Sequence, residues 1–138
     1  LLRETKQSAK IKILINEDEK LSNLVGDGVL VATPAGSSAY NFSVHGPILP
    51  INCNLLALTP ISPFRPRHWR GALLPAKSKI KFEILESDKR PVSVVADFHE
   101  IRDVKTIEII EDRSKKITLL FDEEESLDDK IISEQFVF

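Results

Sequence analysis

Short alternations of apolar and polar residues are the feature that most limits how this chain can fold. In the segment AKIKILI, Ile11, Ile13 and Ile15 alternate with polar or small residues, and residues 77–85 (KSKIKFEIL) alternate in the same way. A period of two residues places one set of side chains on a single face of a β-strand. Both segments therefore predict strands that have one face in a hydrophobic core.

Turn residues recur between such segments every eight to twelve residues. Turns are expected at residues 16–20, 26–28 and 87–90, where polar residues and glycine gather. This spacing favours an all-β, sandwich-like domain over alternating β and α units, and residues 1–138 are expected to form one β-rich domain. Further strands are predicted at residues 21–25, 29–33, 55–58, 91–97, 105–111 and 115–121.

Two segments break the strand pattern and predict short helices. Residues 37–44 follow a Pro-Ala-Gly turn, and Ser37 is a candidate N-cap. In residues 126–136, apolar residues recur at helical spacing behind Ser126, a second candidate N-cap, with two aspartates in the first turn. The acidic run before this C-terminal helix is interpreted as a solvated lead-in.

Composition excludes several classes of function. The net charge of the 138 residues is −2, so the chain has no basic field for nucleic acid or an anionic membrane. Its apolar runs are far too short to span a bilayer. Cys53 is the only cysteine, which excludes an internal disulfide and a cysteine-based zinc site and favours the cytoplasm. No metal-binding residues are predicted. The chain has no methionine, which indicates a piece of a longer protein.

Residues 59–75 form a proline-rich segment with two open interpretations. Its prolines are expected to exclude both a helix and a central strand. The segment is either a sandwich crossover with solvated arginines, or a rigid loop that presents Phe64, Trp69 and its arginines to a ligand or partner.

Residues 26–43 (GDGVLVATPAGSSAYNFS) carry an unusual density of hydrogen-bonding side chains. Glycine allows a ligand to approach the backbone closely, and small hydroxyls suit sugars, amides and phosphates. A common Asp-Gly hairpin turn is the plainer interpretation of the start of the segment. The sequence contains no phosphate-binding P-loop motif and no Gly-x-Ser-x-Gly elbow. The residues alone predict a site for a small polar ligand on a β-domain.

Residues 26–50 (GDGVLVATPAGSSAYNFSVHGPILP) resemble the nucleotide-binding core of the NAD kinase family. The family pattern is Gly-Asp-Gly, an apolar strand, Thr-Pro-x-Gly-Ser-Thr-Ala-Tyr, a serine three residues later, and Gly-Gly-Pro-Ile. The segments LALTPISP and VVADFHEIRDVKTIEI resemble later parts of the same domain. The chain departs from the pattern at four positions: Ser38 replaces Thr, His45 replaces Gly, Val25 replaces a frequent Arg, and Phe98 replaces Gly or His.

This resemblance implies transfer of a phosphoryl group from ATP or polyphosphate to the adenosine-ribose 2′-hydroxyl of NAD, with a divalent metal such as Mg²⁺. Family members are homodimers or homotetramers whose NAD sites are shared between subunits. Their Gly-Gly-Asp-Gly and Asn-Glu motifs belong to an N-terminal α/β domain, and neither motif occurs here. The chain therefore resembles the NAD-positioning C-terminal domain, and no catalytic residue is expected in it. The alternative is a non-catalytic β-sandwich that binds a nucleotide or a partner.

The resemblance also implies which residues contact NAD. Asp27 matches an acid that reaches the nicotinamide side. The adenine and ribose pockets are matched by the segment Ser38, Ala39, Tyr40, Asn41, Phe42 and Ser43. Ser62 and Phe64 match positions beside a ring pocket, and Asp97 and His99 match a turn near the adenosine ribose.

Overall fold

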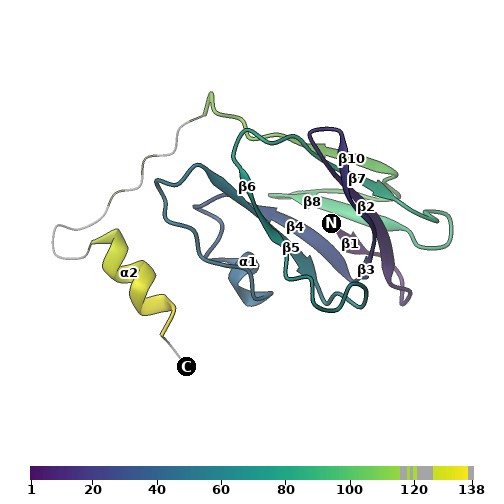
Figure 1. Ribbon diagram of the computed structural model, residues 1–138, viewed down its shortest axis with the longest axis horizontal. Helices are drawn as coiled ribbons and strands as arrows, with labels where there is room; N and C mark the ends of the chain where they lie inside the picture. Colours follow the sequence, from purple (N-terminus) through teal and green to yellow (C-terminus); the bar gives the residue numbers. More distant parts are fainter. Residues whose placement is uncertain (116–117, 119, 121–125, 137–138) are drawn as a thin grey trace.

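The computed structural model describes residues 1–115, 118, 120 and 126–136, and these residues are mostly β (Figure 1). Two antiparallel sheets face each other, with strand orders β6-β5-β4-β1-β8-β9 and β10-β7-β2-β3. The predicted all-β, sandwich-like class is therefore confirmed. The strands are β1 (Leu2–Arg3), β2 (Ala9–Ile15), β3 (Asp18–Gly26), β4 (Gly28–Ala32), β5 (Leu55–Ile61), β6 (Ala72–Pro75), β7 (Ile80–Ile84), β8 (Val92–Ala96), β9 (His99–Ile101) and β10 (Thr106–Ile109).

The four-stranded sheet is built on the two alternating segments. Strands β2 and β7 pair in antiparallel register, with Ile13 opposite Phe82, and their alternate side chains are buried as predicted. Strand β3 returns beside β2 after a tight turn in which Asn16 and Glu17 both have positive φ. The strand therefore begins three residues earlier than residues 21–25 indicated.

The six-stranded sheet includes part of the proline-rich segment. Strand β5 continues through Pro60 to Ile61, contrary to the expectation that prolines would exclude a central strand. Strand β6 pairs only with residues 55–58 of β5, whereas β4 pairs with β5 as far as Ile61. At Pro60 the strand thus has a neighbour on one side only, which is the kind of position where a sheet tolerates proline.

The chain crosses from one sheet to the other at two of the expected turns, residues 26–28 and 87–90. Strands β3 and β4, on either side of Asp27, lie in different sheets, and so do β7 and β8, on either side of residues 87–90. Close packing explains the glycine at the first crossing: a Cβ on Gly28 would lie 2.0 Å from the carbonyl oxygen of Leu1. The Gly-Asp-Gly motif is therefore a sheet-to-sheet crossing rather than a hairpin turn.

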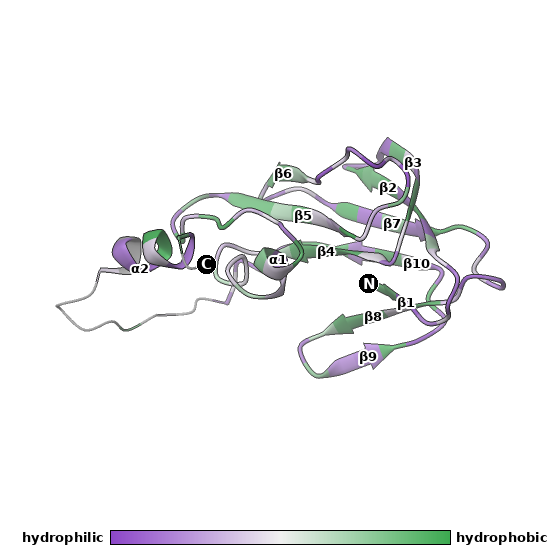
Figure 2. Ribbon diagram, turned by 90° about the horizontal axis from the view of Figure 1, so that it is seen from below, coloured by the Kyte–Doolittle hydropathy of each residue, from purple (hydrophilic) through white to green (hydrophobic). Residues whose placement is uncertain are grey.

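The main core lies between the two sheets. Ile11, Ile13 and Phe82 from the small sheet pack with Val29 and Leu56 from the large one, and each is at most 2% exposed. Figure 2, turned by 90° from Figure 1, shows the central strand β4 of the large sheet as mostly hydrophobic. Burial of these apolar side chains is the main stabilising contribution to the fold.

A second, smaller core lies under the connection between β4 and β5. Ala32, Leu49 and Ala57 are buried there, with Leu30 packed against them. Side chains alternate along a strand, so Leu30 and Ala32 point away from the main core that holds Val29. The connection, which includes helix α1 (Tyr40–Ser43), therefore covers part of the outer face of the large sheet.

Helix α2 (Leu127–Glu134) confirms the predicted C-terminal helix. The Ser126 hydroxyl accepts a hydrogen bond from the Asp129 backbone N–H at 3.1 Å, so Ser126 is the N-cap as expected. The strand predicted at residues 115–121 lies largely outside the described residues. Within the part of the chain that the structure describes, no helix is long and apolar enough to cross a membrane.

Candidate functional site

The loop that follows β4 is held from within by Ser37. Its side chain is fully buried, donates a hydrogen bond to the Pro34 carbonyl at 2.7 Å and accepts one from the Leu49 N–H at 2.8 Å. The expectation that Ser37 caps the helix is wrong, because α1 has Ala39 at its N-cap position and no side-chain cap. Ser37 instead ties the two ends of the loop together.

Asn41 attaches α1 to the sheet. Its amide nitrogen donates to the carbonyls of Ser37 (3.0 Å) and Pro47 (2.9 Å), and its oxygen accepts a hydrogen bond from the Thr59 hydroxyl at 2.6 Å. Gly46 packs so closely that a Cβ there would lie 2.2 Å from the Asn41 oxygen. Asn41, which is predicted to contact NAD, is 1% exposed, and its polar side-chain atoms contact the protein instead of solvent.

The neighbours of Asn41 face outward. Tyr40 is 52% exposed and Phe42 41% exposed, although both are large and aromatic. Ser38, Ala39 and Ser43 are also exposed. One helical turn directs Asn41 into the protein and its neighbours to solvent, so five of the six residues predicted in this segment are exposed.

Asp27 occupies the crossing between the sheets. Its carboxylate forms an ion pair with Arg3, with Nε and Oδ1 2.6 Å apart, and remains partly exposed. The Asp27 N–H donates to the Ile61 carbonyl, and its own carbonyl accepts from the Arg3 N–H, both at 2.9 Å. The position of the acid is therefore fixed by two strands that are distant in sequence.

Ser62 and Phe64 lie beside Asp27. The Phe64 N–H donates to the Val25 carbonyl at 2.7 Å, and the Val25 N–H donates to the Arg65 carbonyl at 2.8 Å, which fastens this loop to the end of β3. Phe64 is 50% exposed. The guanidinium carbons of Arg65 and Arg67 lie 5.6 and 5.2 Å from the centre of its ring, within the range of cation–π contacts.

The exposed residues of the α1 segment and the region around Asp27 are both attached to β5 or its end. Thr59, which holds α1, and Ser62, which adjoins Asp27, are three residues apart, about 10 Å in a strand. The outward surface of α1 and the Asp27 corner therefore occupy neighbouring parts of the molecule.

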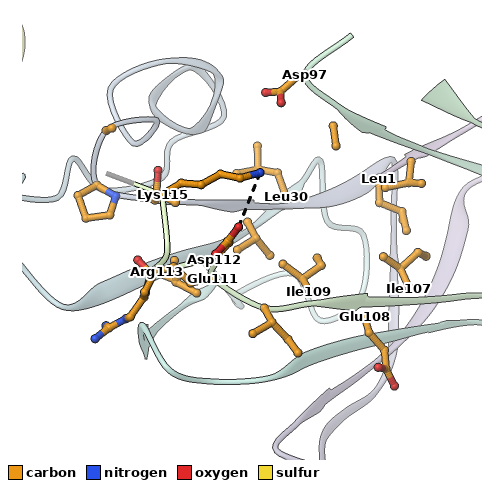
Figure 3. Close-up of a pocket in the computed structure, with 18 of the residues that line it drawn as sticks. Leu1, Leu30, Asp97, Ile107, Glu108, Ile109, Glu111, Asp112, Arg113 and Lys115 are labelled. Carbon is orange, nitrogen blue, oxygen red and sulfur yellow. Dashed lines mark hydrogen bonds and ion pairs between the residues drawn. The ribbon is translucent and has the colours of Figure 1, made fainter. Parts of the chain in front are cut away.

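Asp97 and His99 lie in a third place. Asp97, with φ of 53°, is in the turn between β8 and β9, and His99 begins β9. Asp97 lines a broad open groove together with residues 33–35 at the far end of β4 (Figure 3). Ile107 and Ile109 of β10 form part of the opposite side of this groove. Asp27 lies at the start of β4 and Asp97 near its end, so the length of the strand places the two acids about 15–20 Å apart.

Sequence reasoning missed the residues that support these surfaces. Arg3 lies outside every motif, and only its contact with Asp27 identifies it. Thr59 and Gly46 lie in segments that resemble the family pattern, but only their contacts with Asn41 show that they support α1. Such contacts join residues that are apart in the sequence, so no local spacing could predict them.

Two glutamates on and beside the solvent face of the small sheet have lowered pKa values. Hydrogen bonds from Lys12 and Lys81 lower the pKa of the Glu83 carboxyl, and hydrogen bonds from Lys10 and Arg90 lower that of Glu86. These shifts reflect surface ion pairs. Among the described residues, no three His, Cys, Asp or Glu side chains cluster as they would around a metal ion.

The chain matches the family described as the ATP-NAD kinase C-terminal domain over residues 3–113. It is 60% identical over 136 residues to an NAD kinase of Rhizorhabdus wittichii and 55% identical over 136 residues to one of Xanthomonas campestris pv. campestris. Each alignment covers 99% of this chain and 53% of the relative, so the chain spans about half the length of these relatives.

Two solved structures are similar in fold. The crystal structure of yeast NADH kinase complexed with NADH matches with a TM-score of 0.65 and 28% identity, over 78% of this chain and 32% of that one. An NAD kinase from Archaeoglobus fulgidus in complex with ATP matches with a TM-score of 0.69 and 27% identity, over 82% and 43%. The chain therefore belongs to the NAD kinase family and corresponds to its C-terminal domain.

Proposed function

We propose that this chain is the NAD-binding part of an enzyme that phosphorylates NAD at the adenosine-ribose 2′-hydroxyl with ATP, giving NADP. The observation that carries the proposal is the outward surface of α1: hydroxyls and a half-exposed tyrosine ring on a segment whose backbone is held by Ser37 and Asn41. The same residues carry the NAD kinase motif. The similarity to kinases whose structures hold NADH or ATP supports the same ligand class.

The side chains suit a dinucleotide. The rings of Tyr40 and Phe64 offer flat apolar surfaces to a base or nicotinamide, and the hydroxyls of Ser38 and Ser43 can donate to and accept from ribose. Asp27, oriented by Arg3, provides a fixed carboxylate for an amide or hydroxyl donor. Rigid positioning of this kind lowers the entropic cost of bringing the 2′-hydroxyl in line with a phosphoryl group.

The remainder of the reaction is assigned to the part of the relatives that this chain does not span. Phosphoryl transfer needs groups that cradle the donor phosphates and a residue that receives or orients the acceptor proton. We assign both to that part, and residues 1–138 supply no proton-transfer step. Mg²⁺ enters with ATP as the metal–nucleotide substrate, and polyphosphate is the second candidate donor.

Contacts with a second copy complete the proposed site. Tyr40 and Phe64 each expose about half of their surface, which leaves one side of a bound ring open. Asp97 and His99 lie at the other end of β4, where they would contact the adenosine ribose. We therefore propose a homodimer or homotetramer with shared NAD sites.

We place the enzyme in the cytoplasm, a reducing compartment that suits a chain with one cysteine.

The test uses the full protein that contains this chain. NADP formation is measured from NAD, ATP and Mg²⁺ with an NADP-specific coupled assay, and reactions without ATP or without NAD serve as controls. ATP-dependent NADP formation is expected. A folded protein that binds NAD without producing NADP would contradict the kinase assignment and favour the non-catalytic nucleotide-binding module.

A further inference from the structure

We infer that the hydrogen bond between Asn41 and Thr59 is a positioning device, which sets where α1 presents its outward side chains to NAD. The inference rests on the proposed function. It assigns Asn41 and Thr59 a role as positioning residues, because neither side chain reaches the surface: Asn41 is 1% exposed and Thr59 2% exposed.

Helix α1 needs such a device because it cannot hold itself in place. It has four residues, and helices this short are not stable on their own. Its N-cap residue, Ala39, makes no side-chain capping bond, and Asn41 is the only buried residue of the helix. Among the residues of the helix itself, Asn41 alone therefore attaches α1 to the sheet.

Every polar atom of that side chain is used. The two amide hydrogens serve the carbonyls of Ser37 and Pro47, which lie before and after the helix. The oxygen accepts the Thr59 hydroxyl at 2.6 Å, which is the side-chain link from the loop to strand β5. Gly46 lies against the same oxygen and leaves room for no other side chain. Asn41 thus joins both flanks of α1 to one point of the sheet.

The site of attachment is rigid. Thr59 lies within β5, opposite Leu30 of β4, and its side chain points to the outer face where the second core packs. A loop fastened to the middle of a sheet holds its exposed neighbours in a fixed position. Loss of the Thr59 hydroxyl would leave a buried carbonyl oxygen of Asn41 with one partner fewer, and α1 would shift toward solvent to recover it.

The experiment compares Thr59→Val with Thr59→Ser in the full protein. Valine has nearly the same shape as threonine but no hydroxyl, whereas serine keeps the hydroxyl and loses a methyl group. Thr106→Val, on an exposed position of β10, is the matched control for the same exchange on a strand surface. The measurements are KM for NAD, kcat, and amide hydrogen exchange in peptides that cover residues 38–44.

Thr59→Val is expected to raise KM for NAD by about tenfold, with a smaller change in kcat, and to speed exchange in residues 38–44. Thr59→Ser and Thr106→Val are expected to stay within about twofold of the wild type. Should Thr59→Val not fold, Gly46→Ala displaces Asn41 from its other side and is expected to give the same two effects.

The outcomes separate the inference from the proposed function. Faster exchange with an unchanged KM would overturn the positioning role, as would equal KM values for Thr59→Val and Thr59→Ser. A raised KM with unchanged exchange would also overturn the positioning role, because the change in KM would then not arise from movement of residues 38–44. If the wild type forms no NADP, the proposed function fails, whereas the exchange comparison still tests the attachment of α1.

Discussion

Replacement of Tyr40 by alanine is expected to weaken NAD binding far more than replacement by phenylalanine. Tyr40 is 52% exposed, so about half of its surface is free to be covered by a ligand. An aromatic side chain can bury roughly 200 Å², which leaves about 100 Å² for NAD. At about 25 cal/mol per Å², complete coverage is worth about 2.5 kcal/mol, or roughly sixtyfold in affinity.

Tyr40→Phe keeps the ring and removes one hydroxyl. A neutral hydrogen bond contributes about 0.5–1.5 kcal/mol, so this change is expected to cost about two- to tenfold. Neither substitution is expected to change the free energy of unfolding by more than about 1 kcal/mol, because Tyr40 belongs to neither hydrophobic core.

The assay is NAD titration by calorimetry in the full protein, together with KM and kcat for NAD. Leu73→Ala, at a position on β6 that is 50% exposed, controls for the loss of an equally exposed apolar side chain elsewhere. Equal losses for Tyr40→Phe and Tyr40→Ala would refute the ring-contact reasoning and assign the effect to the hydroxyl. No loss for either would remove Tyr40 from the site.

Four further predictions follow from the same contacts. Asp27→Asn should lower kcat/KM for NAD by about ten- to a hundredfold in the full protein while the circular dichroism spectrum stays the same, since a charged hydrogen bond is worth roughly 1.5–3 kcal/mol; unchanged kinetics would exclude Asp27 from the site. Purified residues 1–138 should give a β-type circular dichroism spectrum yet form no NADP from NAD, ATP and Mg²⁺, and clear turnover would mean that a residue of this chain performs the chemistry. Phe82→Ala should reduce the free energy of unfolding by about 3–5 kcal/mol in denaturant titrations, because Phe82 is 1% exposed between the sheets; a loss below about 1 kcal/mol would contradict the packing. The pKa of Glu83 is lowered from its ordinary value of 4.5, so its contribution to stability is present above about pH 4.5 and is lost as the pH falls through the lower folded value; Glu83→Gln should flatten this acid dependence in unfolding measurements, and an unchanged slope would exclude the Lys12 and Lys81 contacts as its cause.

Local patterns in the sequence determined most of the strands. Alternation placed Ile11, Ile13 and Phe82 on buried faces, and the structure confirms all three. Ser126 and the apolar spacing after it predicted the C-terminal helix with its cap. These predictions succeeded because the period of side chains along a strand or helix depends only on neighbouring residues.

The sequence also located the candidate site, through a motif that is continuous from Gly26 to Pro50. It could not determine how that motif is folded. The Gly-Asp-Gly motif suits a hairpin equally well, and only the pairing of β3 and β4 with different partners makes it a crossing between sheets. Pro60 likewise lies in a strand because β6 ends before reaching it.

Tertiary contacts alone decided which side chains of the motif face solvent. Asn41 and Tyr40 are adjacent and both polar, yet one is buried and the other is half exposed. The difference arises because Thr59, eighteen residues away, supplies a buried hydrogen bond to Asn41. In the same way, Arg3 of β1 fixes Asp27 through an ion pair. Such partners come together only when strands distant in sequence pair, and no local spacing encodes that pairing.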